Sequence, residues 1–243
     1  MKNFVYNQIP DLEKNNWWFQ GRRKIILTII DSIFKNKNDL VILDAGCGGG
    51  SIINILEKYG KVFGIDNSKK MVKLCRFNQK EVVLGKLEKI PFEDNKFDLV
   101  VALEVLEHIK KDLLALKEIN RVLKPGGYLF LSVPAFKFLW GNQDVAANHK
   151  RRYSEKQLIK QLNLAGFVNN KINFMNFIFF IPIAIVRVLR RFISREKPEL
   201  DSKYFDNKTI INKFFAEIFK IEAKILPFVK VPFGATLLSV SKK

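Results

Sequence analysis

A cluster of glycines at positions 46, 48, 49 and 50 constrains the fold of this chain more than any other stretch. An apolar run, residues 41–45, precedes the cluster, and a helix-compatible segment, residues 51–57, follows it. This order predicts a strand, a tight turn and a helix N-terminus. Glycines let the backbone approach a ligand closely, and the first turn of a helix presents N–H groups without intrahelical partners. We therefore predict a ligand-binding turn.

Asp44 distinguishes between two classes of ligand for this turn. The dinucleotide fingerprint G-x-G-x-x-G is not met, because the third glycine would fall at position 51, where the chain has Ser51. A carboxylate at the mouth of the turn would repel a pyrophosphate, but it would attract the ammonium and sulfonium groups of S-adenosylmethionine. The pattern favours S-adenosylmethionine over NAD.

A second carboxylate, Asp66, ends the next predicted strand, residues 61–66, and lies 22 positions after Asp44. This is close to the roughly 20-residue spacing at which such folds place a ribose-binding acid. Ser68 is predicted to cap the helix that follows. The glycine turn and the spaced acid together are a stronger signal than either alone.

The remainder of the chain alternates strands with helices. Further strands are predicted at residues 81–85, 97–103 and 128–134, from residue 167, and at residues 235–241. This alternation predicts an α/β fold with a doubly wound, Rossmann-like parallel sheet.

Composition bounds the setting of the protein. The hydrophobic content of 48% argues against disorder, and two cysteines, Cys47 and Cys75, form neither a disulfide framework nor metal-ligand spacing. The cysteine pattern predicts a reduced, cytoplasmic setting and no metal site. The first residues show no secretory signal, which is consistent with that expectation. The net charge of +18 calls for an anionic partner or surface, although abundant lysine and asparagine explain part of it as compositional bias. The motif that amino-group methyltransferases of nucleic acids carry is absent after Val101, and the sequence has no aromatic-basic binding module. Nucleic acid is therefore not an expected partner.

Between residues 40 and 135 the chain resembles the class I S-adenosylmethionine-dependent methyltransferases, in particular the small-molecule and quinone-biosynthesis group. The matching segments are residues 43–50, 64–66, 90–92, 97–100, 107–108 and 123–127. The resemblance implies seven strands, with the last antiparallel between the fifth and sixth, and a helical insertion before it. It also implies S-adenosylmethionine as cofactor and S-adenosylhomocysteine as product.

The resemblance implies roles for single residues. Gly46 and Gly48 would line the methionine part of the cofactor, Asp66 would hold the ribose hydroxyls, and residues near Leu87 and Glu88 would flank the adenine. The full set of expected cofactor-binding residues is Asp44, Gly46, Gly48, Asp66, Asn67, Leu87, Glu88 and Glu104. Many relatives carry an acid where this chain has Lys86, so the adenine amino group would meet a backbone carbonyl or Glu88 instead. His108 after Glu107 is expected to have a structural or capping role, because in the family this pair opens a helix.

The expected domain organisation is a single methyltransferase domain, residues 1–243. Its parts are N-terminal cap helices (1–38), a cofactor-binding core (39–175), an amphipathic helical insertion (176–230) and the final strand (231–243). Within the first part, Trp17 to Phe19 precede Arg22 and Arg23. This group could cover an adenine or close over a carboxylate. It could equally be a hydrophobic staple with solvated arginines.

The loop after the fifth strand is the expected substrate side, since doubly wound sheets bind ligands beyond the carboxyl ends of their strands. His149 could serve as a catalytic base oriented by Asp144. The expected substrate-binding residues are Trp140, Arg151, Arg152 and Tyr153. Alternatively, Ser154 and Gln157 form a capping box, and residues 151–153 are only the entrance to the next helix.

The insertion contains an uncharged run, residues 172–186, that is too short to span a bilayer and is interrupted by Pro182. An amphipathic element in the membrane interface is one interpretation; a lid or a dimer face is the other. In the first, anionic headgroups would meet Arg187, Arg190, Arg191, Arg195 and Lys197. The polar stretch 196–207 then leads to a second helix, residues 209–226, whose expected apolar face is Ile210, Phe214, Ile218, Ile221 and Ile225.

Together these features predict methyl transfer to a lipid-linked or amphiphilic acceptor, such as a polyprenyl-linked glycan or a quinone-like molecule, at the inner face of a membrane. One alternative is methylation of a soluble metabolite, with the insertion as a lid. Another is a non-catalytic, cofactor-binding partner of a second methyltransferase. The acceptor atom, whether oxygen, nitrogen or carbon, is left open.

Overall fold

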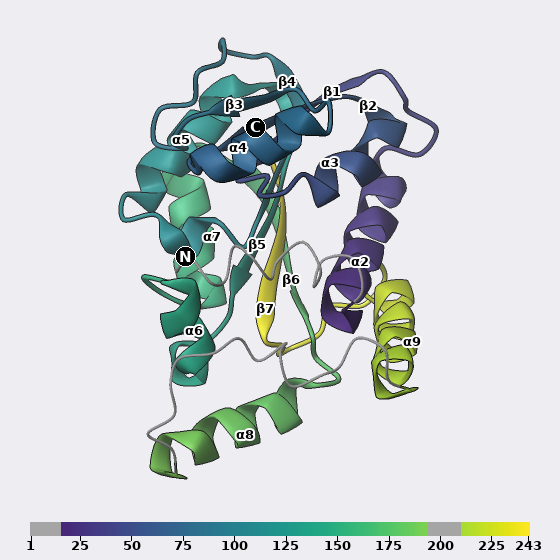
Figure 1. The fold of residues 1–243 in the computed structure, drawn as a ribbon, viewed down its shortest axis with the longest axis vertical. Helices are drawn as coiled ribbons and strands as arrows, with labels where there is room; N and C mark the ends of the chain where they lie inside the picture. The colour runs from purple at the N-terminus through teal and green to yellow at the C-terminus, as the bar shows by residue number, and fades with distance from the viewer. Residues whose placement is uncertain (1–15, 194–209) are drawn as a thin grey trace. The chain divides into compact units, whose positions relative to one another are not determined.

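A computed structural model describes residues 16–193 and 210–243 (Figure 1). The chain forms two compact units. The sheet unit comprises Asn36–Pro134, Tyr153–Ile172 and Leu237–Lys243, and the helical unit comprises the described residues within Met1–Lys35, Ala135–Arg152 and Asn173–Thr236.

The sheet has seven strands in the order β3-β2-β1-β4-β5-β7-β6, which confirms the predicted fold. They are β1 (Leu40–Ala45), β2 (Gly60–Asp66), β3 (Val82–Leu84), β4 (Phe97–Leu103), β5 (Leu123–Pro134), β6 (Val168–Met175) and β7 (Thr236–Lys242). β7 is antiparallel, as expected from the resemblance. The Gly126 N–H donates to the Lys243 carbonyl and the Lys243 N–H donates to the Gly127 carbonyl, which joins β5 to the residue that follows β7.

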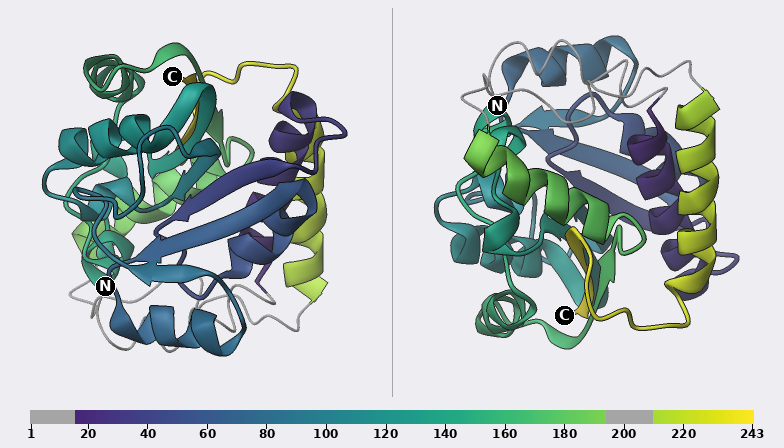
Figure 2. Two further views of the ribbon diagram at one scale, coloured as in Figure 1. Left: turned by 90° about the horizontal axis from the view of Figure 1, so that it is seen from above. Right: turned by 90° about the horizontal axis from the view of Figure 1, so that it is seen from below.

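Helices cover both faces of this sheet. They are α3 (Ser51–Leu56), η1 (Glu57–Tyr59), α4 (Lys69–Phe77), η2 (Leu106–His108), α5 (Asp112–Val122) and α7 (Glu155–Leu164). From β1 the following strands are added on one side of the sheet, and from β4 they are added on the other side. Crossovers between parallel strands are right-handed. Helices of the two halves therefore lie on opposite faces, and Figure 2 shows the sheet between α4 on one side and α5 and α7 on the other.

The register aligns the carboxyl ends of the central strands. Asp44 lies opposite Gly64 of β2 and Val101 of β4, and Ala45 lies opposite Ile65. The direction of strand order reverses between β1 and β4, which is where open α/β sheets bind ligands.

β5 begins earlier than the sequence predicts. The strand was expected from residue 128, but Leu123 already pairs with Phe97, and the register then shifts so that Tyr128 lies opposite Leu99. Gly126 has a φ of +76°, which a side chain would disfavour, and it lets the chain pass this irregularity without leaving the sheet.

The helical unit contains α2 (Trp17–Ile33), η3 (Lys137–Leu139), α6 (Asn142–Ala147), α8 (Phe180–Ile193) and α9 (Ile210–Ile225). α2 and α9 lie side by side in Figures 1 and 2. Gly21 permits this approach, because a Cβ there would lie 2.3 Å from the Phe219 ring. The backbone N–H of Trp17 also donates to Asn212 Oδ1 at 2.8 Å.

An aromatic cluster fills the space between these helices. The Trp17 ring lies 5.1–5.3 Å, between centroids, from the rings of Phe179, Phe215 and Phe219. Trp17 is buried. Its indole thus packs against the insertion. Such a hydrophobic contact is what the staple interpretation predicts for Trp17. The same interpretation expects Arg22 to be solvated, which is wrong, because that residue is 8% exposed.

The expected apolar face of α9 is wrong in part. Phe214 and Ile221 are exposed, whereas Phe219, Glu222 and Ala223 are buried. The helix has apolar residues on more than one side. Packing against α2 buries the side that also carries the carboxyl group of Glu222.

No helix in the described ranges combines the length and the apolarity that crossing a bilayer requires.

Candidate functional site

The glycine turn lies at the carboxyl end of β1, as predicted. Gly46, Gly48 and Gly50 have φ angles of +82°, +51° and +83°, which explains why the turn needs glycine. The N–H groups of Gly46 and Cys47 donate to the Ile65 carbonyl, at 2.8 and 3.2 Å, and tie the turn to β2. The turn is therefore held by the strand that carries Asp66.

Asp66 links the turn to the next helix. One carboxylate oxygen accepts the Gly48 N–H at 3.0 Å, and the other accepts the Ser68 N–H at 2.8 Å. Burial raises the pKa of Asp66, and the backbone bonds from Ser68, Gly48 and Asn67 oppose that rise. A carboxylate has about four lone-pair sites, so beside these three backbone donors Asp66 keeps the capacity to accept a further hydroxyl group. Ser68 also caps α4, as predicted.

The space around the turn fits a ligand at Gly48. A Cβ on Gly48 would meet no atom within 4 Å, whereas a Cβ on Gly46 would lie 2.4 Å from Val105. The backbone at Gly48 is thus open to a ligand while that at Gly46 is packed. Asp44, buried at 2% exposure, adds a carboxylate at the same end of β1. These residues fit a cationic ligand with a ribose.

The other expected cofactor residues lie in the same unit. Glu104, directly after β4, has a φ of +52°, which is rare outside glycine. Its side chain accepts the Ser132 hydroxyl at 3.0 Å, which holds it in this conformation. Such strain is concentrated at functional sites. Leu87 is buried, Glu88 is half-buried, and Asn67 is exposed.

Cys75 of α4 contacts the glycine turn, which the sequence did not predict. Its thiol donates to the Gly48 carbonyl at 3.2 Å. A hydrogen bond with Cys75 and burial strongly raise the pKa of Cys47, so that thiol stays protonated. Neither the spacing nor the type of these cysteines signalled a role in supporting the turn.

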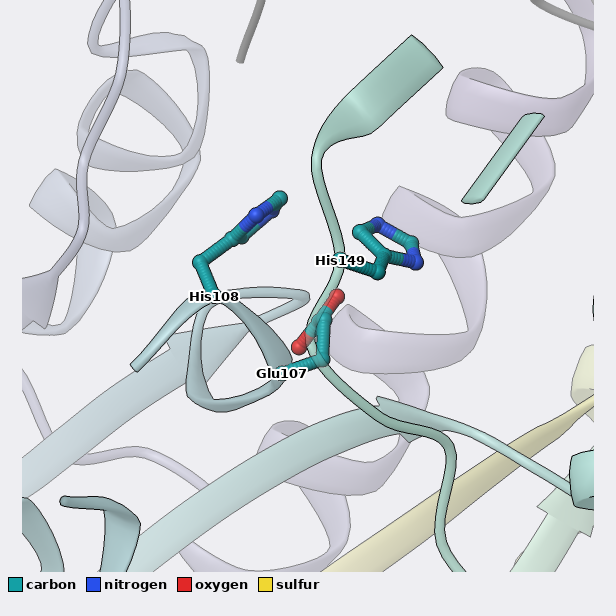
Figure 3. Close-up of side chains that lie close together, drawn as sticks. All are labelled: Glu107, His108 and His149. Carbon is teal, nitrogen blue, oxygen red and sulfur yellow. The ribbon is translucent and has the colours of Figure 1, made fainter. Parts of the chain in front are cut away.

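Glu107 and His108 lie on η2, just beyond β4 (Figure 3). The next helix, α5, starts only at Asp112, so the pair does not open it. His149, the third residue labelled in Figure 3, belongs to the helical unit and follows α6.

Asp144 is the centre of a polar cluster in the helical unit. Its fully buried carboxylate contacts His149 Nδ1 at 2.8 Å and accepts from Arg152 Nε at 2.9 Å and from the Gly141 N–H at 2.8 Å. Burial would raise the pKa of Asp144, but the His149 bond and the charge of Arg152 outweigh it and lower the pKa to about 2. The carboxylate is therefore ionised throughout the neutral range.

The expected substrate-binding residues differ in how they are held. Arg152 is buried and also donates to the Ala135 carbonyl at 2.9 Å, so it supports the loop from inside. Tyr153 is buried in the sheet unit, where its hydroxyl donates to Asp112 at 2.9 Å. Trp140 and Arg151 are half-buried. The capping box of Ser154 and Gln157 is present at the start of α7.

Arg187 does not face outward from α8 as expected. It donates to the Leu139 carbonyl and to Gln143 Oε1, both at 2.8 Å, and lies 3.8 Å from Asp144. The prediction that Arg187 meets lipid headgroups is therefore wrong, because residues of η3 and α6 bind its guanidinium. The side chains of Arg190 and Arg191, together with Arg195, Lys197 and the stretch 196–207, lie outside the described part of the chain.

Comparisons with known proteins agree with this geometry. A family model described as "Methyltransferase domain" matches residues 43–131. An uncharacterised protein of Methanocaldococcus jannaschii is 33% identical over 181 residues, which cover 72% of this chain and 77% of that protein.

More distant relatives carry activity names. The demethylmenaquinone methyltransferase of Staphylococcus aureus is 37% identical over 113 residues, which are 40% of this chain and less than half, 47%, of that enzyme. A solved S-adenosylmethionine-dependent methyltransferase from Thermotoga maritima matches all of both chains with a TM-score of 0.59 and 18% identity. That structural match supports the fold.

Proposed function

Because the chain belongs to the class I S-adenosylmethionine-dependent methyltransferases, we propose that it methylates a lipid-linked or amphiphilic acceptor, such as a polyprenyl-linked glycan or a quinone-like molecule, at a membrane surface. The methyl transfer itself, from S-adenosylmethionine, is the activity of the family. The nature of the acceptor and the place of the reaction are the proposal.

In this proposal the sheet unit binds the cofactor. Asp66 accepts the ribose hydroxyls, Gly46 and Gly48 line the methionine part, and Asp44 attracts its positive charges. Leu87 and Glu88 flank the adenine, Asn67 lies beside the ribose, and Glu104 borders the methionine end. The hydrogen bonds of Asp66 with Gly48 and Ser68 support these roles, because they place the acid and the turn in one rigid group.

His149 is the proposed catalytic base. Its Nδ1 contacts the ionised Asp144 at 2.8 Å, so the neutral ring carries its proton on Nδ1 and its lone pair on Nε2. Nε2 takes the proton of an acceptor hydroxyl or activated carbon while the acceptor attacks the methyl group. The cofactor supplies an activated methyl whose departing sulfur keeps the bonding electron pair. Asp144 acts through His149 and is a positioning residue.

The exposed side of α8 carries the membrane part of the proposal. Apolar side chains that are at least one-third exposed follow one another in this segment: Ile178, Ile181, Ile185, Val186, Val188 and Leu189. Several of them recur at the spacing of one helix face. The net charge of +18 favours an anionic surface as the partner of this apolar face.

Flotation with anionic liposomes tests the membrane part. We expect the wild-type protein to float at low salt, and a double variant, Ile181→Glu with Ile185→Glu, to stay in the dense fraction. Phe77→Glu is the matched control, because Phe77 is 85% exposed and lies in the sheet unit. A wild-type protein that stays unbound at low salt, or a double variant that floats like the control, would exclude this role for α8.

A soluble acceptor with α8 as a lid is the second candidate. The observation that favours it is Arg187, whose hydrogen bonds tie α8 to Leu139 of η3 and Gln143 of α6, the helix that carries Asp144. In that case Arg187→Gln would alter the KM for the acceptor, and liposomes would leave the rate unchanged.

A further inference from the structure

One side of α9 carries a stripe of apolar side chains, the α9 stripe: Phe214, Ile218, Ile221, Ile225 and Phe228. The first, third and last of these are 61%, 55% and 88% exposed, and the other two are half-buried. Helix α2 packs against a different side of α9, where Phe219 and Ala223 are buried. Contiguous exposed apolar side chains of this size mark interaction surfaces. The described part of the chain therefore leaves a second apolar face of α9 open to a partner.

The spacing of the α9 stripe is that of a helix–helix seam. Its members follow one another in steps of four, three, four and three residues, the heptad pattern with which two helices pack side by side. Backbone hydrogen bonds from Leu226 to Glu222 and from Val229 to Ile225 continue the helical path past the end of α9, so Phe228 extends the stripe. Two heptads are short for isolated helices, but α9 is already folded against α2. Pairing therefore costs little further ordering of the helix.

Two charged residues, Glu217 and Lys224, are exposed beside the α9 stripe at equivalent heptad positions, seven residues apart. In an antiparallel pair of α9 helices, with Ile218 of one copy opposite Ile221 of the other, these positions face each other across the seam. Glu217 of each copy then lies opposite Lys224 of the other, so two ion pairs form by symmetry. A parallel pair would place Glu217 opposite Glu222, which is unfavourable for two acids.

The charge of Glu217 is available for such a contact. Within its own helix it forms an ion pair with Lys220 at 2.5 Å, but both side chains are more than half exposed. An exposed pair of this kind contributes little to stability, so exchanging it for a pair across the seam costs little. The opposite charges on one helix make its surface complementary to itself, as an interface between identical chains requires.

We propose that α9 is the interface of a homodimer, in which two copies of this chain pair their α9 stripes antiparallel about a twofold axis. Ile218 packs against Ile221 of the second copy, and Phe214 packs against Ile225 of the second copy. The ion pairs between Glu217 and Lys224 fix the antiparallel direction. The proposal concerns one helix of the helical unit, and it depends neither on the methyl acceptor nor on binding of α8 to a membrane.

Charge exchange between Glu217 and Lys224 tests the pairing. Sedimentation velocity at several protein concentrations should show a concentration-dependent dimer for the wild type. Glu217→Lys and Lys224→Glu should each weaken dimerisation about 10-fold, because each turns two favourable pairs into two like-charge pairs. The double variant, which carries both changes, restores opposite charges and should dimerise like the wild type. Lys160→Glu is the control, because it makes the same change in charge at an exposed residue of α7.

Ile221→Glu tests the apolar part of the seam. It places a carboxylate opposite Ile218 of the second copy, so the dimer should be lost. Because Ile221 is 55% exposed in the single chain, the variant should fold and melt like the wild type at a concentration where both are monomers. Phe77→Glu is the matched control, since it introduces the same charge at an exposed apolar residue of α4 and should leave the dimer intact.

Several results would overturn the proposal. A wild-type protein that is monomeric up to about 100 μM would exclude the dimer, and a dimer that persists in Ile221→Glu would place the interface elsewhere. A double charge variant that dimerises no better than the single variants would exclude the antiparallel pairing. A monomer whose binding to phosphatidylglycerol vesicles is weakened by Lys224→Glu and strengthened by Glu217→Lys would assign the α9 stripe to a membrane instead.

Discussion

Nδ1 of His149 lies 2.8 Å from Oδ1 of Asp144, and Nε of Arg152 shares that oxygen at 2.9 Å. The carboxylate thus orients the imidazole while the arginine, which also bonds the Ala135 carbonyl, fixes the carboxylate to the loop. Enzymes support a general base in the same way. The bond at Nδ1 keeps the proton of the neutral ring on that nitrogen, which leaves Nε2 as the basic nitrogen.

Replacement of His149 should affect turnover and not cofactor binding. For His149→Gln we expect a decrease in kcat of about 10²- to 10⁴-fold, the contribution typical of a positioned base. The affinity for S-adenosylhomocysteine should stay within about twofold of wild type, since every expected cofactor-binding residue is intact. Initial rates with a labelled methyl donor, together with calorimetry, measure both quantities. His108→Gln is the control, and an unchanged rate for His149→Gln would remove His149 from the mechanism.

Asp66→Asn should weaken cofactor binding. Both oxygens of Asp66 accept backbone N–H groups, so an amide must turn its NH₂ towards one of these donors. Hydrogen bonds to charged groups contribute about 1.5–3 kcal/mol, which predicts an affinity for S-adenosylhomocysteine about 10- to 100-fold lower. Glu81→Gln, which removes an exposed ion pair with Lys61, is the control. Calorimetry that gives equal affinities for the two variants would exclude the ribose contact.

Two glycine substitutions should have opposite outcomes. At Gly48 a methyl group meets no protein atom, so Gly48→Ala should fold with a small loss of stability from its φ of +51°, about 1–2 kcal/mol. It should lose at least 10-fold in cofactor affinity, because the methyl group enters the ligand's space. At Gly60 the added atom would lie 2.0 Å from the Leu40 carbonyl oxygen, so Gly60→Ala should not fold. Thermal melting and calorimetry test this contrast, which a Gly48→Ala protein with normal affinity would contradict.

Glu222 should make stability depend on pH. Burial raises the pKa of Glu222 to about 7, despite backbone hydrogen bonds led by that of Asn176. In the unfolded chain this group titrates near 4.5, so the folded state binds the extra proton between these values. Its contribution to stability is therefore full below pH 4.5 and is lost as the pH rises through about 7, by roughly 3 kcal/mol in total.

Glu222→Gln should remove this dependence. Urea unfolding of wild type and variant at several pH values from 4.5 to 8 gives the difference, which cancels the titration of other groups such as Asp66. The variant should gain stability over wild type as the pH rises. A difference that does not vary with pH would contradict the titration of Glu222 in this range.

Local patterns predicted the parts of the structure that depend on local chemistry. The glycine turn and the caps at Ser68 and Ser154 follow from steric and hydrogen-bonding rules that act within a few residues. The strand order follows from the family's motifs, which lie in sequence order along the chain.

Features that depend on contacts between distant segments were not predictable in this way. The face of α9 is chosen by packing against α2, so Glu222 is buried where Ile221 was expected. Arg187 binds a loop more than 40 residues away, and Cys75 supports a turn 27 residues earlier. The burial of Arg22 belongs to the same class, since nothing in its local sequence separates it from the half-buried Arg23.

The partition of transferred methyl label distinguishes an amphiphilic acceptor from a water-soluble one. Purified protein is incubated with methyl-labelled S-adenosylmethionine and a membrane extract of the source organism, and the products are divided between organic and aqueous phases. For an amphiphilic acceptor and His149 as the base, we predict that label enters the organic phase with the wild type and not with His149→Gln. Label confined to water-soluble products, or no transfer to any component of the extract, would contradict this prediction.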